Sequence, residues 1–216
     1  MSSQTLILLL VVILSNLNSI SCLEFVFNTN FNPTNIHTYG NATIENSIVS
    51  LTNQTVFTIG RALYPSKITT KQHNSTNPLP FSTSFIFSIS PYKNILPGHG
   101  LSFGFFPFAG IAGTSSTEYL GLFNLTNNGN SENHVLAVVF DVFEDTIFNG
   151  TKENYVGLDV NSLTTIASSA AGFWTDDNKF KELKLNNGVN YQAWIDYEDS
   201  RINVTVAKAG ATIPTK

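Results

Sequence analysis

Apolar and polar residues alternate with a period of two along several stretches of the chain, which is the pattern of half-buried β-strands. After Phe81, the odd positions Phe85, Phe87 and Ile89 are apolar, and Ser82, Ser84 and Ser88 stand at even positions of the same stretch. The same alternation runs through 191–197 and through 202–206. Asp199-Ser200 lies between these last two segments, so we expect them to form a hairpin.

Two further runs, Leu101–Phe108 and Val135–Phe143, are apolar at nearly every position. Such runs suit strands that another sheet covers. Clusters of Asn and Gly at 127–130, 149–150 and 186–188 mark turns between the strands. No long stretch has helical periodicity, so the pattern predicts an all-β sandwich or barrel.

Composition narrows the function classes. The 216 residues are 42% hydrophobic and 12% charged, which favours one globular domain over a disordered chain or a coiled coil. The net charge of −4 argues against nucleic acid as a partner. A single cysteine, Cys22, excludes an internal disulfide framework.

Residues 1–22 differ from the rest of the chain. Leu6–Leu14 is continuously apolar but too short for the roughly 20 residues that span a bilayer. Small polar residues follow, so 1–22 is predicted to be a secretory signal peptide and 23–216 the mature domain. A buried strand and an uncleaved anchor are the alternatives. No second long apolar run occurs, so no transmembrane helix is expected in this chain.

N-glycosylation sequons support passage through the secretory pathway, because the chain holds several of them. The acceptor asparagines are Asn41, Asn53, Asn74, Asn124, Asn149 and Asn203. We expect a secreted glycoprotein with at least some of these sites in use.

Several sequence blocks, taken in chain order, resemble the legume (L-type) lectins. They are Gly98–Phe103, Tyr119–Asn124, Val138–Phe143, Val156–Ser162, Ala193–Tyr197 and Ile202–Val206. Gly60-Arg61-Ala62-Leu63-Tyr64 and Gly98-His99-Gly100 look most like the lectin ectodomains of plant L-type lectin receptor kinases.

The resemblance implies a concanavalin-like jelly-roll sandwich, with a flat back sheet and a curved front sheet. It also implies a shallow sugar site organised by calcium and a transition metal, and homo-oligomers formed through the back sheet. Family members continue for several strands past Pro214, so we expect the last strands to be missing and the lectin domain to be incomplete at its C-terminus. The implied setting is plant cell-surface recognition or defence, either secreted or at the plasma membrane as part of a longer receptor.

The metal positions are altered in this chain. The family uses a Glu-x-Asp pair on a strand, followed by Asn, Asp and His in the next loop. The corresponding residues here are Val139, Asp141, Asp145, Asn149 or Gly150, and Tyr155. Valine has no ligand atom, and calcium needs several oxygen ligands. Asp141 and Asp145 remain as residual candidates, so we expect no transition metal and at most weak calcium binding.

The family's sugar contacts are an Asp, a Gly that donates its backbone amide, an aromatic ring and an Asn. They correspond here to His99, Glu118, Phe143 and Asp145. A neutral imidazole accepts one hydrogen bond, Glu118 adds a charge, and Asp145 lacks the amide donor. Phe143 stays suited to stacking on a sugar face. A glycan on Asn149 would obstruct this site.

Three functions remain open. The first is a carbohydrate-binding, lectin-like domain with eroded sites that recognises a sugar or another extracellular small ligand. The second is the ectodomain fragment of a lectin receptor kinase that binds a non-sugar ligand or a protein partner. The third is a β-glucanase-like glycosidase, because Asp141 and Glu144 fit two positions of an E-x-D-x-x-E strand. Val139 takes the place of the nucleophile, so we expect no enzyme activity.

The two tryptophans have different predicted roles. Trp194 lies in a block that matches the family, so we expect it to pack in the fold. Trp174 stands next to a polar loop and is a candidate for surface recognition.

Overall fold

The computed structural model describes residues 23–28, 30–91, 98–107, 110–143 and 154–211. In these ranges the regular structure is β apart from two 3-10 turns, η1 (Thr117–Tyr119) and η2 (Ser131–Asn133). The strands are β1 (His37–Gly40), β2 (Thr43–Glu45), β3 (Ile48–Ser50), β4 (Gly60–Leu63), β5 (Phe81–Phe87), β6 (Gly100–Phe105), β7 (Leu136–Asp141), β8 (Tyr155–Val160), β9 (Ala167–Ala170), β10 (Gly172–Trp174), β11 (Phe180–Glu182), β12 (Tyr191–Glu198) and β13 (Arg201–Lys208).

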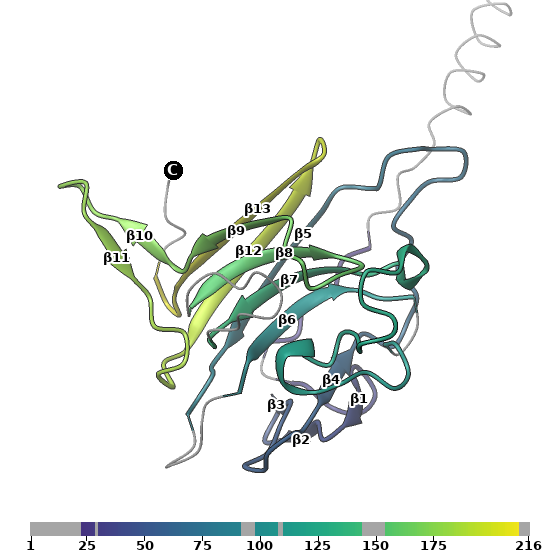
Figure 1. Cartoon of the computed structure of the whole chain (residues 1–216), viewed down its shortest axis with the longest axis horizontal. Coiled ribbons are helices and arrows are strands. Elements are labelled where there is room, and N and C mark those ends of the chain that lie inside the picture. The colour runs from purple at the N-terminus through teal and green to yellow at the C-terminus, as the bar shows by residue number, and fades with distance from the viewer. Residues whose placement is uncertain (1–22, 29, 92–97, 108–109, 144–153, 212–216) are drawn as a thin grey trace, which may run out of the picture.

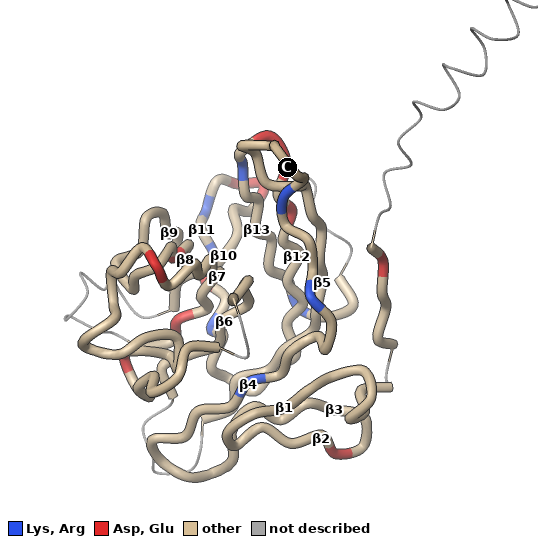
Figure 2. The backbone as a smooth tube through the Cα atoms, turned by 90° about the vertical axis from the view of Figure 1, so that its right-hand side faces the viewer, with Lys and Arg blue, Asp and Glu red and all other residues tan. Residues whose placement is uncertain are grey.

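Two antiparallel sheets form the sandwich. One has the order β13-β12-β5 and the other the order β6-β7-β8-β9 (Figure 1). Figure 2, seen from the side, separates these two layers and places β1 to β4 beneath them. The pairs β1-β4, β2-β3 and β10-β11 are small additional sheets. The predicted all-β sandwich is therefore confirmed.

The predicted hairpin at the C-terminal end is also confirmed. Glu198 pairs with Arg201, and the two residues between them, Asp199 and Ser200, have φ angles of 48° and 62°. Two consecutive left-handed residues are the mark of a type I′ turn, whose twist matches that of antiparallel strands.

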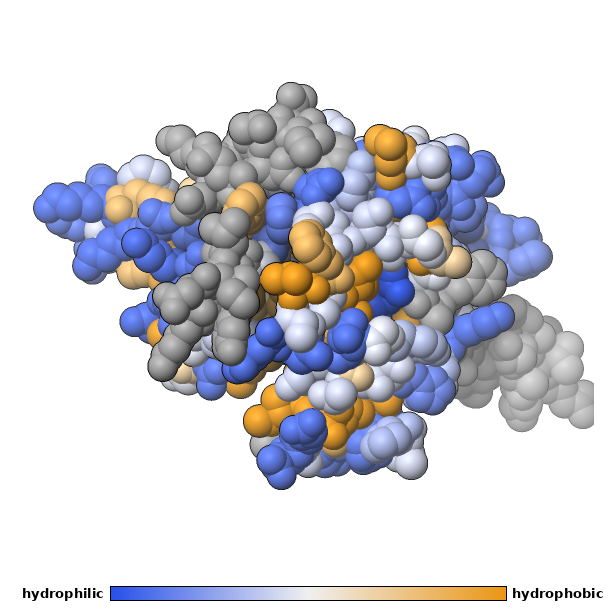
Figure 3. Space-filling model, turned by 60° about the horizontal axis from the view of Figure 1, so that its bottom comes forward, coloured by the Kyte–Doolittle hydropathy of each residue, from blue (hydrophilic) through white to orange (hydrophobic). Residues whose placement is uncertain are grey.

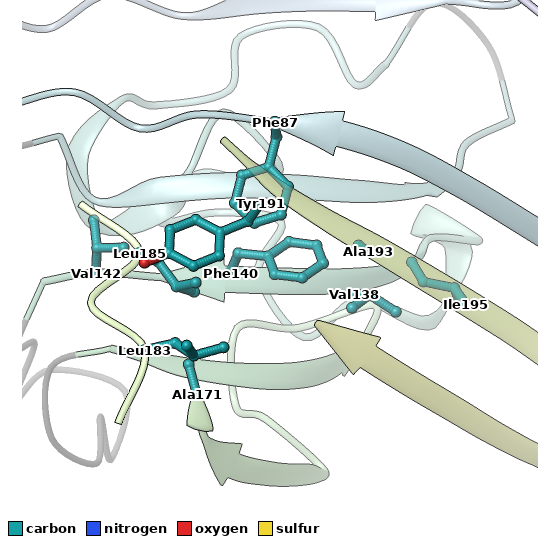
Figure 4. Packing of buried hydrophobic residues seen from close by; sticks show 10 residues of the cluster. All are labelled: Phe87, Val138, Phe140, Val142, Ala171, Leu183, Leu185, Tyr191, Ala193 and Ile195. Atoms are coloured by element: carbon teal, nitrogen blue, oxygen red, sulfur yellow. The ribbon is translucent and has the colours of Figure 1, made fainter. Parts of the chain in front are cut away.

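Aromatic and aliphatic side chains from both sheets fill the space between the layers. Phe140 of β7 contacts Phe85 edge-on and Phe87 at a ring-centroid distance of 4.9 Å. Figure 4 shows Phe87, Phe140 and the rest of their cluster converging from β5, β7 and β12, and from the segment that follows β11. The members of this main cluster are Phe87, Val138, Phe140, Val142, Ala171, Leu183, Leu185, Tyr191, Ala193 and Ile195.

The opposite face of β7 is buried as well, but loops rather than a sheet cover it. Ala137 and Val139 point into a second cluster whose other members come mainly from 119–135. These members are Tyr119, Leu122, Phe123, Val135 and Leu163. The predicted burial of both faces is confirmed for β7, whereas the prediction that a sheet covers them holds on one face alone.

The remaining surface is mixed. Figure 3, which brings the lower side of Figure 1 forward, shows apolar atoms in separate patches among hydrophilic ones. Over the described ranges, no helix has the length and apolar character needed to cross a membrane.

Candidate carbohydrate site

His99 and Phe143 meet at one end of the paired strands β6 and β7. Their ring centroids are 4.5 Å apart, and the ring planes are inclined by 39°. The backbone amide of Val142 donates to the carbonyl of His99 at 2.9 Å, which extends the β6-β7 ladder by one step. Gly100 permits this approach, because a Cβ there would lie 2.3 Å from the carbonyl oxygen of Phe140.

Glu118 lies on the loop that covers the second cluster, near enough to His99 for the two side chains to interact electrostatically. The pKa of Glu118 is lowered, first by a hydrogen bond from the Thr117 hydroxyl and to a smaller extent by the charge of His99. We call His99, Glu118 and Phe143 the His99 cluster. The fold thus brings His99 and Phe143 into contact and places Glu118 within electrostatic range of His99, while Asp145, the fourth residue predicted to contact sugar, lies outside the described residues.

The backbone of the Glu118 loop is strained. Thr117 has a φ of 61°, which is rare for a β-branched residue, and Leu120 has a φ of 51°. Strain of this kind persists when the surrounding contacts hold it in place, and it occurs often at binding sites.

Arg61 of β4 holds this loop in place. Its Nη2 atom donates to the carbonyl of Gly121 at 2.8 Å and to that of Ile111 at 3.5 Å. The same nitrogen also donates to the hydroxyl of Thr114. Burial lowers the pKa of Arg61 from its usual value. Arg61 belongs to a sequence block that resembles the legume lectins. Its hydrogen bonds to this loop could not be predicted from the sequence, because the loop is distant along the chain.

The residues at the family's transition-metal positions do not fit a transition metal. Val139 is fully buried in the second cluster and has no ligand atom. Of the Asp141 oxygens, Oδ1 accepts from the amide of Phe143 at 2.9 Å and Oδ2 from the Tyr155 hydroxyl at 3.4 Å. The described residues contain no group of three or more His, Cys, Asp or Glu side chains placed to hold a metal. Glu144, Asp145 and Asn149 lie outside them.

A second buried acid lies on the same face of this sheet. Asp159 of β8 is 1% exposed, and its Oδ1 has no hydrogen-bond partner among the residues that the structure describes. Burial raises its pKa to about 6, a hydrogen bond from Thr165 opposes this, and the charge of Asp141 adds to it. Burial and Asp141 also raise the pKa of Tyr155 to about 12. One pattern in the sequence could have indicated Asp159, because it is an acid at an inward position of an apolar strand.

The β10-β11 hairpin projects away from the two main sheets (Figure 1), and Trp174 is the last residue of β10. The indole is 70% exposed and packs edge-on against Phe180 with centroids 5.4 Å apart. The turn is ordered by a hydrogen bond of 2.9 Å from the Thr175 amide to the Lys179 carbonyl. Trp174 is thus at the surface, as a recognition role requires, and it is far along the chain from the residues of the His99 cluster.

Proteins of similar sequence include plant receptor kinases and lectin-like proteins. The chain is 52% identical to L-type lectin-domain containing receptor kinase VII.1 of Arabidopsis thaliana over 98% of its own length and 31% of the relative's. It is 36% identical to a lectin-like protein of the same plant, over 97% of this chain and 81% of that protein. The chain therefore spans about a third of the length of the receptor kinase it matches.

Solved structures show the same fold. A peanut lectin with a nine-residue peptide superposes with a TM-score of 0.70 at 24% identity, over 87% of this chain and 77% of that one. A metal-free form of lectin I-B4 from Griffonia simplicifolia gives 0.67 at 26% identity, over 83% and 75%. The family model of the legume lectin domain matches residues 22–216. The chain thus belongs to the legume lectin domain family.

Proposed function

We propose that this domain binds carbohydrate outside the cell, through the His99 cluster and without a transition metal. The observation that carries the proposal is the contact of His99 with Phe143, next to a charged side chain on a braced loop. Membership of a lectin family supports the ligand class, and the predicted signal peptide and sequons support the location.

The cluster has the chemistry that a sugar needs. Phe143 is half-buried, so part of its ring is open to stack on the C–H face of a pyranose. The imidazole of His99 can exchange one hydrogen bond with a sugar hydroxyl, and the ionised carboxylate of Glu118 can accept from two. This set has a single aromatic platform and few donors, which favours an oligosaccharide held at several points over one monosaccharide.

Binding without catalysis is the other part of the proposal. A retaining glycosidase needs two carboxylates about 5 Å apart. The first position of the E-x-D-x-x-E pattern is Val139, which is packed among apolar side chains. A family of binding domains and the loss of this carboxylate together favour recognition over hydrolysis.

A glycan array tests the proposal directly. The secreted, glycosylated chain would be applied with and without a chelator, and its folded state checked by size exclusion. We expect oligosaccharide binding that the chelator leaves intact and that Phe143→Ala weakens strongly. Phe173→Ala, which changes an exposed ring on the β10-β11 hairpin, is the matched control and should bind normally. Loss of all binding in chelator, or a folded chain that binds no glycan, would refute the proposal.

A second candidate function is recognition of a peptide or protein as the ectodomain of a longer receptor. The specific observation is Trp174, 70% exposed on an ordered hairpin. Peanut lectin, a structural neighbour, has been solved with a nine-residue peptide. A displayed peptide library would test this candidate. Selected peptides should lose binding to Trp174→Ala and keep it with Phe143→Ala, and the reverse result would assign them to the His99 cluster.

A further inference from the structure

The outer face of the β13-β12-β5 sheet carries a glycosylation sequon next to a tryptophan. Residues that alternate with the core positions point outward here, among them Ser84 and Ile86 of β5 and Trp194 of β12. Ile86 is 61% exposed. Asn203 of β13 is exposed and lies on the same outward face, since its neighbours Ile202 and Val204 pack against the main cluster.

The strand register places the sequon around Trp194. Thr205, the third residue of the sequon, pairs with Trp194, and Asn203 pairs with Asp196. Asn203 and Trp194 are therefore diagonal neighbours on one face, about 7–8 Å apart, a separation that large side chains bridge. A sugar attached to the amide nitrogen of Asn203 would extend over the indole.

We propose that Asn203 carries an N-linked glycan whose first N-acetylglucosamine stacks on Trp194 and shields the outer face of the β13-β12-β5 sheet. The co-reactant is the lipid-diphosphate-linked oligosaccharide of the secretory pathway. The amide Nδ2 of Asn203 forms a bond to C1 of the sugar as the bond between C1 and the diphosphate oxygen breaks. The amide releases one proton, and the lipid diphosphate leaves. The proposal rests on the extracellular location given under the proposed function.

The sequons at Asn124 and Asn53 do not lie on a sheet face beside an indole. Asn124 is engaged in the loop that follows η1: its Nδ2 donates to the carbonyl of Gly113 at 2.9 Å and its Oδ1 accepts from the amide of Thr126 at 2.9 Å. Asn53 is exposed in the segment between β3 and β4, outside any sheet, which makes it the matched control site. Asn203 is thus distinguished by a flat sheet face and an adjacent indole.

The glycan also decides what can pack on this sheet. The resemblance to legume lectins predicts homo-oligomers through the back sheet. A branched sugar rooted on the outward face of β13 would keep a second copy of the chain from packing on the β13-β12-β5 sheet. We therefore expect the chain's own glycan to cover this face. The alternative is that a second copy of the chain covers it, and the experiment must be able to detect such a dimer.

The experiment measures the fluorescence of Trp194 itself. The chain holds two tryptophans, so Trp174→Phe leaves Trp194 as the sole indole. This variant would be secreted from a eukaryotic cell and its Asn203 occupancy measured by glycopeptide mass spectrometry. One sample would be trimmed by an endoglycosidase to a single N-acetylglucosamine. Another would be stripped completely by a glycoamidase, which hydrolyses the amide and leaves an aspartate, so Thr205→Ala supplies the sugar-free form that keeps Asn203. Acrylamide quenching of Trp194 and the Tm would then be compared.

We expect Asn203 to be occupied, and the single-sugar form to be quenched less than the stripped form. Its Tm should be higher by about 2–4 °C, because stacking on an aromatic ring is retained. Thr205→Ser keeps the sequon and should behave like the parent, Thr205→Ala should behave like the stripped form, and Asn53→Gln should change neither reading.

An unmodified Asn203 in the secreted chain would overturn the proposal, as would equal quenching of the single-sugar and stripped forms. A concentration-dependent dimer in the fully glycosylated form, with Trp194 protected by the partner copy, would assign the face to self-association instead. None of these readings depends on ligand binding, so failure here is distinct from failure of the proposed carbohydrate function.

Discussion

The imidazole of His99 lies against the ring of Phe143, with centroids 4.5 Å apart, although the two residues are separated by most of β6, β7 and the loops between them. The antiparallel register of the two strands brings them together, since Gly100 pairs with Asp141. The contact therefore follows from the register of the sheet, and it gives the candidate site an aromatic wall.

Removal of the aromatic wall should weaken sugar binding without unfolding the domain. Phe143→Ala loses a stacking surface, which corresponds to about a tenfold loss of affinity for the best oligosaccharide from the array. Phe143→Tyr keeps the ring and should retain most of the affinity. Isothermal titration of the three proteins measures this, and equal affinities would exclude Phe143 from the site.

Arg61 should matter for the Glu118 loop more than its distance along the chain suggests. Arg61→Met keeps the apolar stem but leaves the carbonyls of Gly121 and Ile111 without this donor. We expect the free energy of unfolding to fall by about 2–3 kcal/mol, and amide exchange in 111–121 to accelerate. Arg201→Met, at an exposed strand end, is the matched control and should show neither effect.

Asp159 should make the fold more stable in mild acid. Its pKa is raised from 3.8 to about 6 in the folded chain, so the folded state binds more protons than the unfolded state between these values. The free energy of unfolding should therefore rise as the pH falls through this window, by up to about 3 kcal/mol. Urea titrations at several pH values measure the slope, which Asp159→Asn should flatten. A full slope in that variant would show that other groups cause it.

Restoring the family's glutamate should not restore a metal site. Val139→Glu would place a carboxylate in the second cluster, among apolar side chains such as Leu122 and Leu163. We expect a loss of about 3–5 kcal/mol in the free energy of unfolding, with no recovery when manganese and calcium are added. Val160→Glu, at a partly exposed strand end, should be tolerated. Rescue of Val139→Glu by metal would mean that the loop still supplies ligands.

Local patterns in the sequence were sufficient for much of the sandwich. Period-two alternation located β5, β12 and β13, and Asp199-Ser200 marked the hairpin between the last two. These features depend on neighbouring residues, which a single sequence displays directly. The residues of β7 are apolar on both faces of the strand, which correctly indicated that both faces are buried. This pattern does not show whether a sheet or loops cover each face.

The parts that could not be predicted depend on contacts between distant segments. Arg61 bonds to a loop that lies 50 to 60 residues away. Thr117 takes a left-handed φ that its β-branched side chain disfavours, so no propensity would suggest it. His99 was placed at a sugar position by resemblance, and the chain fold then showed which residues surround it. The roles of Asp145 and Asn149 remain predictions.

The burial of β7 on both faces also affects how much conformational entropy the Glu118 loop would lose when a ligand binds. The loop that presents Glu118 shares the second cluster with Val139, so the loop cannot open without exposing the other face of the central strand. A ligand that reaches the His99 cluster therefore meets a surface that is already ordered. If an oligosaccharide binds there as proposed, ordering this loop should cost little conformational entropy, and few polar contacts would then be enough to hold it.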